Sequence, residues 1–315
     1  NDYDYSYNAF NENSLLKYID DLIEYKSLTS DEEDKKQNIE EQWILIFKSL
    51  PDSTSILYDH ILFHSLIFKP EKIKNEWIRF LNVAIHQHHF NIAKTSFDFI
   101  SKSKLFDDYE IKFLQIKKLW EEKNIDIAIN KAISIINETP IKLRANIQYT
   151  TGSWLYKNKR FQESIDILID STKNNQRLYK SWRLIAQINH DLYEQTGEIE
   201  NLKQSFEALL NGINSLPHEK SSFPLILNIL SILFIKGNSV IYKLFQERLE
   251  SLPTIIWIKA LPQIIARSNS QELELRNIVL KLMMFIGNEH MHILLFSLPS
   301  IIYFKTRLKW DDGKK

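Results

Sequence analysis

The 315-residue chain contains no cysteine, only six glycines and only eight prolines. The absence of cysteine excludes disulfides, thiolate metal sites and cysteine nucleophiles, and it is more typical of an intracellular protein than of a secreted one. Because glycine and proline are the main turn formers, their scarcity argues against a fold of many short strands. We therefore predict a helical protein.

The sequence also lacks an excess of charge of either sign and lacks long apolar runs. Acidic and basic residues number 40 each, so no net field attracts nucleic acid or an anionic membrane, and we expect neither as a direct partner. We also expect no signal peptide and no membrane span, since no uninterrupted apolar run reaches about 18 residues. Cytoplasm is the expected compartment, with the nucleus as the alternative.

Sequence motifs for catalysis are absent too. The chain has no glycine-rich phosphate loop, no His-Glu-x-x-His helix and no Gly-x-Ser-x-Gly elbow. His86, His88 and His89 lie close together, but two are adjacent and would point to different helix faces, and no carboxylate stands at ligand spacing. We interpret them as a turn between two helices, and we predict no metal site and no catalytic residue.

The apolar residues that are present recur at helical spacing. The first predicted helix has Ser14 as its N-cap and one apolar face, formed by Leu15, Leu16, Ile19, Leu22 and Ile23. A second helix contains Trp43 and Phe47 and ends at Pro51, and a third spans residues 56–68. Proline ends these helices because it lacks a backbone N–H.

Three related segments then predict a repeat. They are Phe90-Asn91-Ile92-Ala93, Ile125-Asp126-Ile127-Ala128 and Phe161-Gln162-Glu163-Ser164, and each follows a helix with a tryptophan: Trp77, Trp120 or Trp154. Their last residues lie 35 and 36 positions apart, close to the period of about 34 in tetratricopeptide repeats. We expect Ala93 and Ala128 at tight crossings between the two helices of a hairpin, with neighbouring hairpins stacked.

The predicted fold is therefore all-α: an elongated alpha solenoid of tetratricopeptide- and HEAT-like helical hairpins. Residues 1–210 form the tetratricopeptide-like repeats, and residues 211–315 continue as HEAT-like hairpins of the same region. In the second part, residues 254–267 and 271–288 form one hairpin, with Pro262 either opening a helix or kinking one.

Four short motifs carry a family resemblance. They are the segments 20–26 (DDLIEYK), 65–70 (SLIFKP, followed by Trp77), 179–186 (YKSWRLIA) and 257–267 (WIKALPQIIAR). Together they resemble the FAT region of the phosphatidylinositol-3-kinase-related protein kinases, most closely the target-of-rapamycin (TOR) branch, over roughly residues 5–305. The segment 290–293 (HMHI) departs from the TOR pattern His-Pro-Gln-Ala. An ATR-like or SMG-like kinase therefore remains an alternative.

The resemblance implies a scaffold of a serine/threonine protein kinase in growth and nutrient signalling. Such a FAT segment clamps and positions the kinase domain in cis and binds TOR-complex subunits, and the full-length kinase can form a homodimer. The kinase domain, with its ATP and Mg²⁺, is absent from this sequence, so the segment itself is expected to be non-catalytic. The apolar run 293–304 is then expected to be covered by later helices or by the kinase domain.

Two alternatives come from other classes of protein. A free-standing tetratricopeptide adaptor would need a polar groove for peptides, which the Ile- and Phe-rich faces do not indicate. A helical enzyme would need a constellation of reactive residues, and none is visible.

The family also binds a highly phosphorylated inositol through lysines and arginines from consecutive repeats. By the resemblance, only Arg79 and Lys180 keep a cation at such positions, and His86 would be mostly neutral. The other positions carry Glu121, Asn146, Thr150 and Asp52, and the nearby Lys117, Lys142 and Arg144 could compensate. We expect the inositol hexakisphosphate site to be lost or much weaker, with Arg79 and Lys180 as its remnant.

Overall fold

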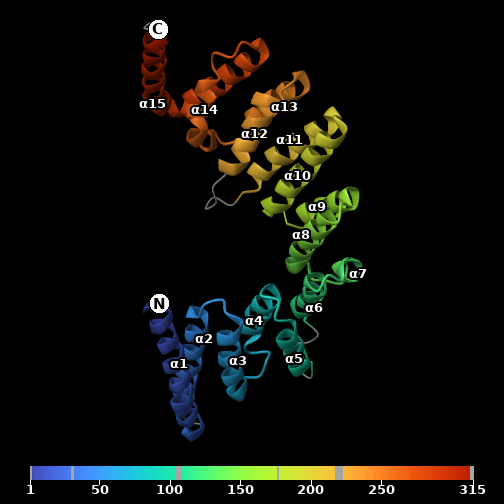
Figure 1. Cartoon of the computed structure of the whole chain (residues 1–315), viewed down its shortest axis with the longest axis vertical. Helices are drawn as coiled ribbons and strands as arrows, with labels where there is room; N and C mark the ends of the chain where they lie inside the picture. The colour runs from blue at the N-terminus through green and yellow to red at the C-terminus, as the bar shows by residue number, and fades with distance from the viewer. Residues whose placement is uncertain are drawn as a thin grey trace. The chain divides into compact units, whose positions relative to one another are not determined.

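A computed structural model describes residues 2–29, 32–101, 103, 108–175, 177–216 and 223–312, with side chains from residue 13 to residue 297 of this set. Within these ranges the chain contains helices and no strand (Figure 1). It divides into two compact units, residues 1–139 and residues 140–315. The predicted all-α solenoid of helical hairpins is confirmed. The predicted change of repeat type at residue 210 stays a prediction.

The described part of unit 1 contains seven helices, and most of them pack against the next helix in the chain. They are α1 (Asp2–Ser27), α2 (Glu33–Ser49), α3 (Thr54–Ile67), α4 (Lys74–His86), α5 (Phe90–Ile100), α6 (Tyr109–Glu121) and α7 (Ile125–Ile136). The core contains the fully buried aromatic residues Trp43, Trp77 and Phe80. Both α2 and α3 end just before the prolines, as predicted.

The predicted face of α1 is wrong. Ser14 is not an N-cap: it lies inside the helix and is buried. Leu16 and Ile23 are 60% and 66% exposed, whereas Tyr18 is completely buried. The reason is a set of polar partners for the Tyr18 hydroxyl on α3, which helical periodicity of apolar residues cannot reveal.

The repeat is confirmed by the turns between paired helices. His88, Lys123 and Lys159 have φ values of 60°, 69° and 61°, and they are again 35 and 36 residues apart. In each turn the following residue donates its N–H to a carbonyl five residues earlier: His89 to Ala84, Asn124 to Leu119 and Arg160 to Leu155. This is the hydrogen bond of a Schellman-type helix end, and it repeats with the same register in all three hairpins.

Small residues sit where the paired helices cross. Ala93, Ala128 and Ser164 are all completely buried, as predicted for the two alanines. In the third hairpin the Ser164 hydroxyl donates to the carbonyl of Gly152 at 2.7 Å. A Cβ on Gly152 would lie 2.7 Å from a carbon of Leu168, so the crossing requires glycine.

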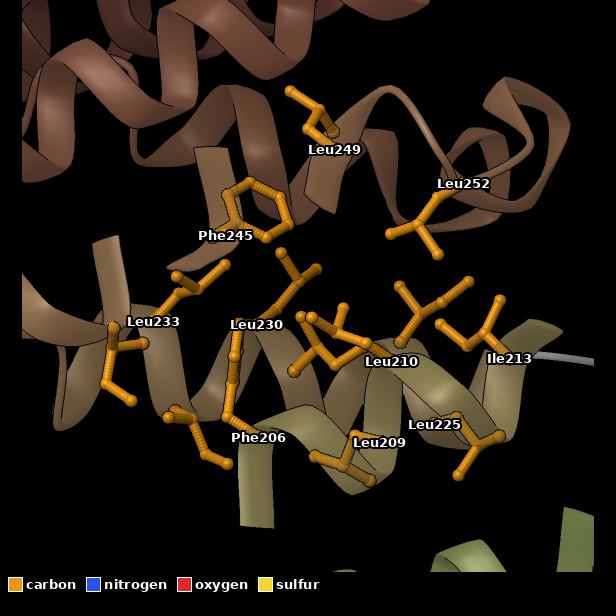
Figure 2. Packing of buried hydrophobic residues seen from close by; sticks show 14 of the residues in the cluster. Phe206, Leu209, Leu210, Ile213, Leu225, Leu230, Leu233, Phe245, Leu249 and Leu252 are labelled. Atoms are coloured by element: carbon orange, nitrogen blue, oxygen red, sulfur yellow. The ribbon is translucent and has the colours of Figure 1, made fainter. Parts of the chain in front are cut away.

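Unit 2 contains α8 (Ile141–Lys157), α9 (Phe161–Asn174), α10 (Tyr179–Thr196), α11 (Ile199–Asn214), α12 (Phe223–Ile235), α13 (Ser239–Leu249), a 3₁₀ helix (Thr254–Ala260), α14 (Leu261–Ala266) and α15 (Leu273–Asp312). Figure 2 shows how Phe206 of α11, Leu230 of α12 and Phe245 of α13 meet in the core. Pro262 opens α14 after the 3₁₀ helix rather than kinking a longer one. The backbone of α15 is non-helical at His290.

The segment Leu273–Ser297 of α15 is long and apolar enough to cross a membrane by length and composition. One face of it, however, is part of the core of unit 2, with Ile278, Leu282 and Ile286 almost fully buried. Core helices of globular domains pass the same test. We therefore interpret α15 as a core helix, and the absence of a membrane span stays a prediction.

Candidate functional site

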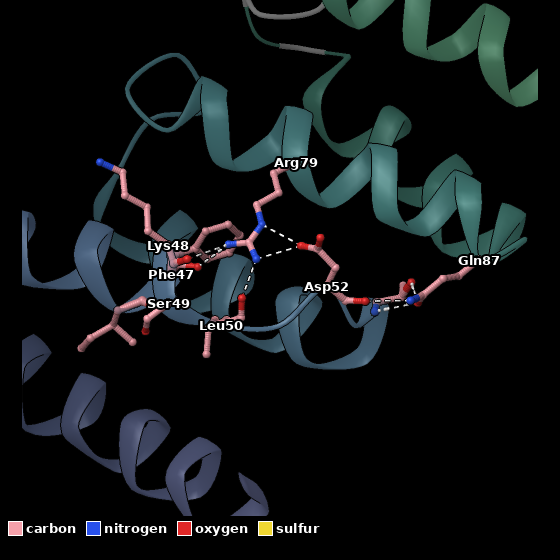
Figure 3. A network of polar contacts seen from close by, with 9 residues as sticks. Phe47, Lys48, Ser49, Leu50, Asp52, Arg79 and Gln87 are labelled. Carbon is pink, nitrogen blue, oxygen red and sulfur yellow. Dashed lines mark hydrogen bonds and ion pairs between the residues drawn. The ribbon is translucent and has the colours of Figure 1, made fainter. Parts of the chain in front are cut away.

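Arg79 on α4, a residue of the predicted anion site, is held by the end of α2 (Figure 3). Its guanidinium donates to the backbone carbonyls of Phe47, at 2.6 Å, and Leu50. Nε and Nη2 donate to the carboxylate of Asp52 at 3.0 and 2.8 Å. The last carbonyls of a helix have no partner within the helix, so Arg79 acts as a C-terminal cap of α2.

Gln87 at the end of α4 reinforces the same junction. Its Oε1 accepts from the N–H and the hydroxyl of Thr54 at 3.0 and 2.7 Å, while its Nε2 donates to the Asp52 carbonyl at 2.7 Å. The loop between α2 and α3 is thus tied to α4 at both ends. All the nitrogens of Arg79 that could meet a phosphate have partners inside unit 1.

Lys180 is exposed in the first turn of α10. It belongs to unit 2 and Arg79 to unit 1, so the loss or weakening of a joint inositol-phosphate pocket stays a prediction. Of the lysines and arginines that could compensate, Lys117 donates to Asn82 Oδ1 at 3.2 Å, and burial lowers its pKa. A lysine held in this way is a weaker candidate for an anion ligand.

Of the three histidines predicted to form the turn between α4 and α5, His88 and His89 lie in it, and His86 is the last residue of α4. Across the described ranges, no three His, Cys, Asp or Glu side chains are grouped so that they could hold a metal ion. One histidine–carboxylate pair, His64 and Glu76, belongs to a buried network elsewhere in unit 1.

That network joins α1, α3 and α4. The Tyr18 hydroxyl lies 3.0 Å from both His60 Nδ1 and His64 Nε2, and His64 Nδ1 lies 2.6 Å from Glu76 Oε2. Since a carboxylate only accepts, His64 Nδ1 carries a proton. The Tyr18 hydroxyl can donate to one of the two histidine nitrogens and accept from the other.

Burial shifts the pKa values of two residues in this network. It lowers the pKa of His60 to about 4, with a smaller contribution from His64, and raises the pKa of Tyr18. The His64 ring also stacks on Trp43, with ring centroids 5.3 Å apart. The network is buried, and of its residues Glu76 also lines a small pocket of about 250 Å³. Because the other members lie between helices, we assign the network to the docking of α1 rather than to chemistry.

Sequence analysis did not anticipate this network, although one signal was present. His60 and His64 are four residues apart in an otherwise apolar helix, and side chains with that spacing share one face. Tyr18, the partner of His60, is 42 residues away in sequence. Glu76, the partner of His64, is 12 residues away. Only packing could identify them.

Comparison with known proteins finds sequence similarity to one protein kinase. The chain is 20% identical to the serine/threonine-protein kinase tor1 of Schizosaccharomyces pombe over an alignment of 350 positions, which covers 94% of this chain and 15% of the relative. No protein-family model matches the chain. The chain thus resembles a helical segment of a TOR kinase and spans a small part of that relative's length.

Proposed function

We propose that this chain is the FAT-region scaffold of a TOR-like serine/threonine protein kinase, which positions the kinase domain and binds partner subunits. The observation that carries the proposal is the similarity to tor1 along 94% of a chain folded as stacked hairpins. A stack of helical hairpins is an extended framework in which each hairpin contacts its neighbours, and such frameworks serve as binding surfaces. ATP and Mg²⁺ belong to the kinase domain in this proposal.

Exposed apolar residues on α15 support the scaffold. Leu295 is 57% exposed and Phe296 is 87% exposed, at the beginning of the apolar run predicted to be covered in the intact kinase. The side chains of residues 298–304 lie outside the described set. Large apolar side chains that face solvent together mark contact surfaces, and we assign this one to the kinase domain.

The proposal is tested on the full-length gene product, tagged and purified from its own cells. We expect transfer of phosphate from ATP to serine or threonine, and cross-links from Lys281 on α15 to the kinase domain. A transcript that ends directly after Lys315, with no phosphotransfer, contradicts the proposal and favours a free-standing adaptor. Identification of the co-purified subunits separates a TOR-like kinase from an ATR-like or SMG-like one, and imaging of the tagged protein separates cytoplasm from nucleus.

A further inference from the structure

A groove of about 630 Å³ lies between α10 and α12, with α11 as its floor. Its volume is within the range of about 300–1,000 Å³ that is usual for ligand sites. One wall is formed by Arg183, Gln187 and His190, which lie on one face of α10 because of their spacing of four and three residues. No carboxylate is among the described residues that line the groove.

Hydrogen bonds behind the α10 wall fix the orientation of Gln187. Its Nε2 donates to Asp191 Oδ1 at 2.7 Å, and the other oxygen of Asp191 accepts from the Tyr156 hydroxyl at 2.5 Å. Because a carboxylate only accepts, the amide nitrogen of Gln187 must face Asp191. The carbonyl oxygen of Gln187 is therefore left as an acceptor for a ligand in the groove.

The orientation of His190 is fixed in the same way. Its Nε2 lies 3.0 Å from the ammonium of Lys236, which also pairs with Glu194. An ammonium only donates, so Nε2 is the acceptor and the ring proton is on Nδ1. Burial, together with Lys236, lowers the pKa of His190, so the neutral ring offers Nδ1–H as a donor.

The opposite wall and the floor complete the groove. Asn228 and Ser231, three residues apart on α12, present an amide and a hydroxyl, and neither has a partner among the described residues. Arg183 is exposed and equally unpaired within the described part of the chain. On the floor, Ser205 is already satisfied, because its hydroxyl donates to the Ala186 carbonyl at 2.8 Å.

We propose that this groove binds an extended peptide segment that carries a carboxylate side chain. The amides of Gln187 and Asn228 match the alternating donors and acceptors of a peptide backbone, and the Arg183 guanidinium matches a carboxylate. A compact polyanion fits less well, since among the described residues only one unpaired cation lines the groove and polyphosphates require several. The Ile- and Phe-rich helical faces had indicated no polar groove. The polar side chains that line this one correct that expectation.

The inference gives a chemical class to one partner of the proposed scaffold, but it rests on the geometry of unit 2. It is tested on the 315-residue chain without any kinase domain, so it can fail or succeed independently of the proposed function. The probes are two displayed libraries of blocked heptapeptides, one with a fixed Asp at the central position and the other with a fixed Asn.

We expect peptides from the Asp library to be enriched on the chain, and the selected peptides to bind at least about tenfold more weakly to the Arg183→Gln variant, because one charge-assisted hydrogen-bonded pair is lost. Arg276→Gln is the matched control, since Arg276 is an exposed arginine of the same unit without a partner among the described residues. The Arg183→Glu variant should instead prefer peptides from a third library, in which the central residue is a fixed Lys.

Asn228→Leu provides a second readout. It should weaken the binding of Asp and Asn peptides by a similar factor, because it removes a contact to the peptide backbone and leaves Arg183 in place. Circular dichroism of each variant checks that the helices are intact. Enrichment equal to that on the bare support, equal binding of Asp and Asn peptides, or equal effects of Arg183→Gln and Arg276→Gln would overturn the proposal.

Discussion

At the scale of single residues, several buried or half-buried polar groups of unit 1 have partners on other helices. The Arg79 guanidinium donates to carbonyls at the end of α2, and the Tyr18 hydroxyl lies between two histidines of α3. Removing one partner of a buried hydrogen bond costs more than the bond itself contributes, because the other partner remains unsatisfied. These residues are therefore where unit 1 is most sensitive to substitution.

Arg79→Met tests the capping role. It removes the guanidinium from the carbonyls of Phe47 and Leu50, and we expect unfolding in urea to become easier by roughly 1–3 kcal/mol. Arg276→Met removes an exposed arginine without a partner among the described residues and should change stability by less than about 0.5 kcal/mol. Equal effects of the two substitutions would show that Arg79 is not a cap.

His60 gives a pH dependence. Its pKa is about 4 in the folded state, below the value of about 6.5 for an unperturbed histidine. Between these values the unfolded chain binds more protons, so the free energy of unfolding decreases as the pH falls from about 6.5 to about 4. His60 contributes up to about 3 kcal/mol to this decrease.

The measurement is a set of urea melts at pH 7 and pH 4.5. His60→Asn should be less stable than the native chain at pH 7 and should lose less stability on acidification. His86→Asn, at the exposed last position of α4, should retain the native pH dependence. An unchanged dependence in His60→Asn would mean that His60 is not buried in its neutral form.

At the scale of helical elements, the hairpin is defined by two local features: a small residue at the crossing and a left-handed residue in the turn. Ala93 and Ala128 have no exposed surface, and the turns before them contain His88 and Lys123 at positive φ. Both features recur with the spacing of the repeat. Each can be tested with one substitution.

Ala93→Leu and Ala128→Leu should overpack their crossings. Three added carbons at a fully buried position force neighbouring side chains apart, and we expect a loss of roughly 1–3 kcal/mol in denaturant melts. Lys94→Leu adds leucine at the next, exposed position of α5 and should be close to neutral. If the alanine variants are as stable as the lysine variant, the assigned repeat register is wrong.

Lys123→Gly should stabilise unit 1. A non-glycine residue at a φ of 69° is strained by its Cβ, and glycine adopts this conformation without strain, so we expect a gain of up to about 1 kcal/mol. Lys131→Gly, inside α7, should instead destabilise by about 1 kcal/mol because of the low helix propensity of glycine. Thermal melts of the two variants should therefore shift in opposite directions.

At the scale of the whole molecule, two separate hydrophobic clusters stand out. One is formed by α1 to α6 in unit 1 and contains Trp43 and Trp77; the other runs from α9 to α15 in unit 2 and contains Phe206 and Trp257. Most contacts lie between helices that are neighbours in the chain. Stability in such arrays is a sum of local terms, so the two clusters need not unfold together.

Scanning calorimetry of the full chain should therefore resolve two transitions. Ala93→Leu should lower the transition temperature of unit 1 alone, because Ala93 belongs to that cluster. Leu230→Ala, in the core of unit 2, should lower the other. A single transition that both variants shift by similar amounts would contradict independent units.

The sequence by itself determined the local features of this protein. Helical spacing of apolar residues, Pro51 at a helix end, the turn at His86–His89 and the alanine register at 93 and 128 depend on residues a few positions apart, and all were predictable. The motifs that resemble a TOR kinase also pointed to the relative that the comparison found.

Only the tertiary structure decided which groups meet across distant helices. It buried Tyr18 instead of Leu16, paired Arg79 with Asp52 and the end of α2, and placed Arg183 and Asn228 on the walls of one groove. The resemblance named Arg79 and Lys180 as remnants of an anion site but could not reveal the partners of Arg79. The periodicity of the sequence indicates which residues share a helix face. Which face is buried, and against which helix, depends on how the helices cross. The crossing follows from the packing of the whole unit.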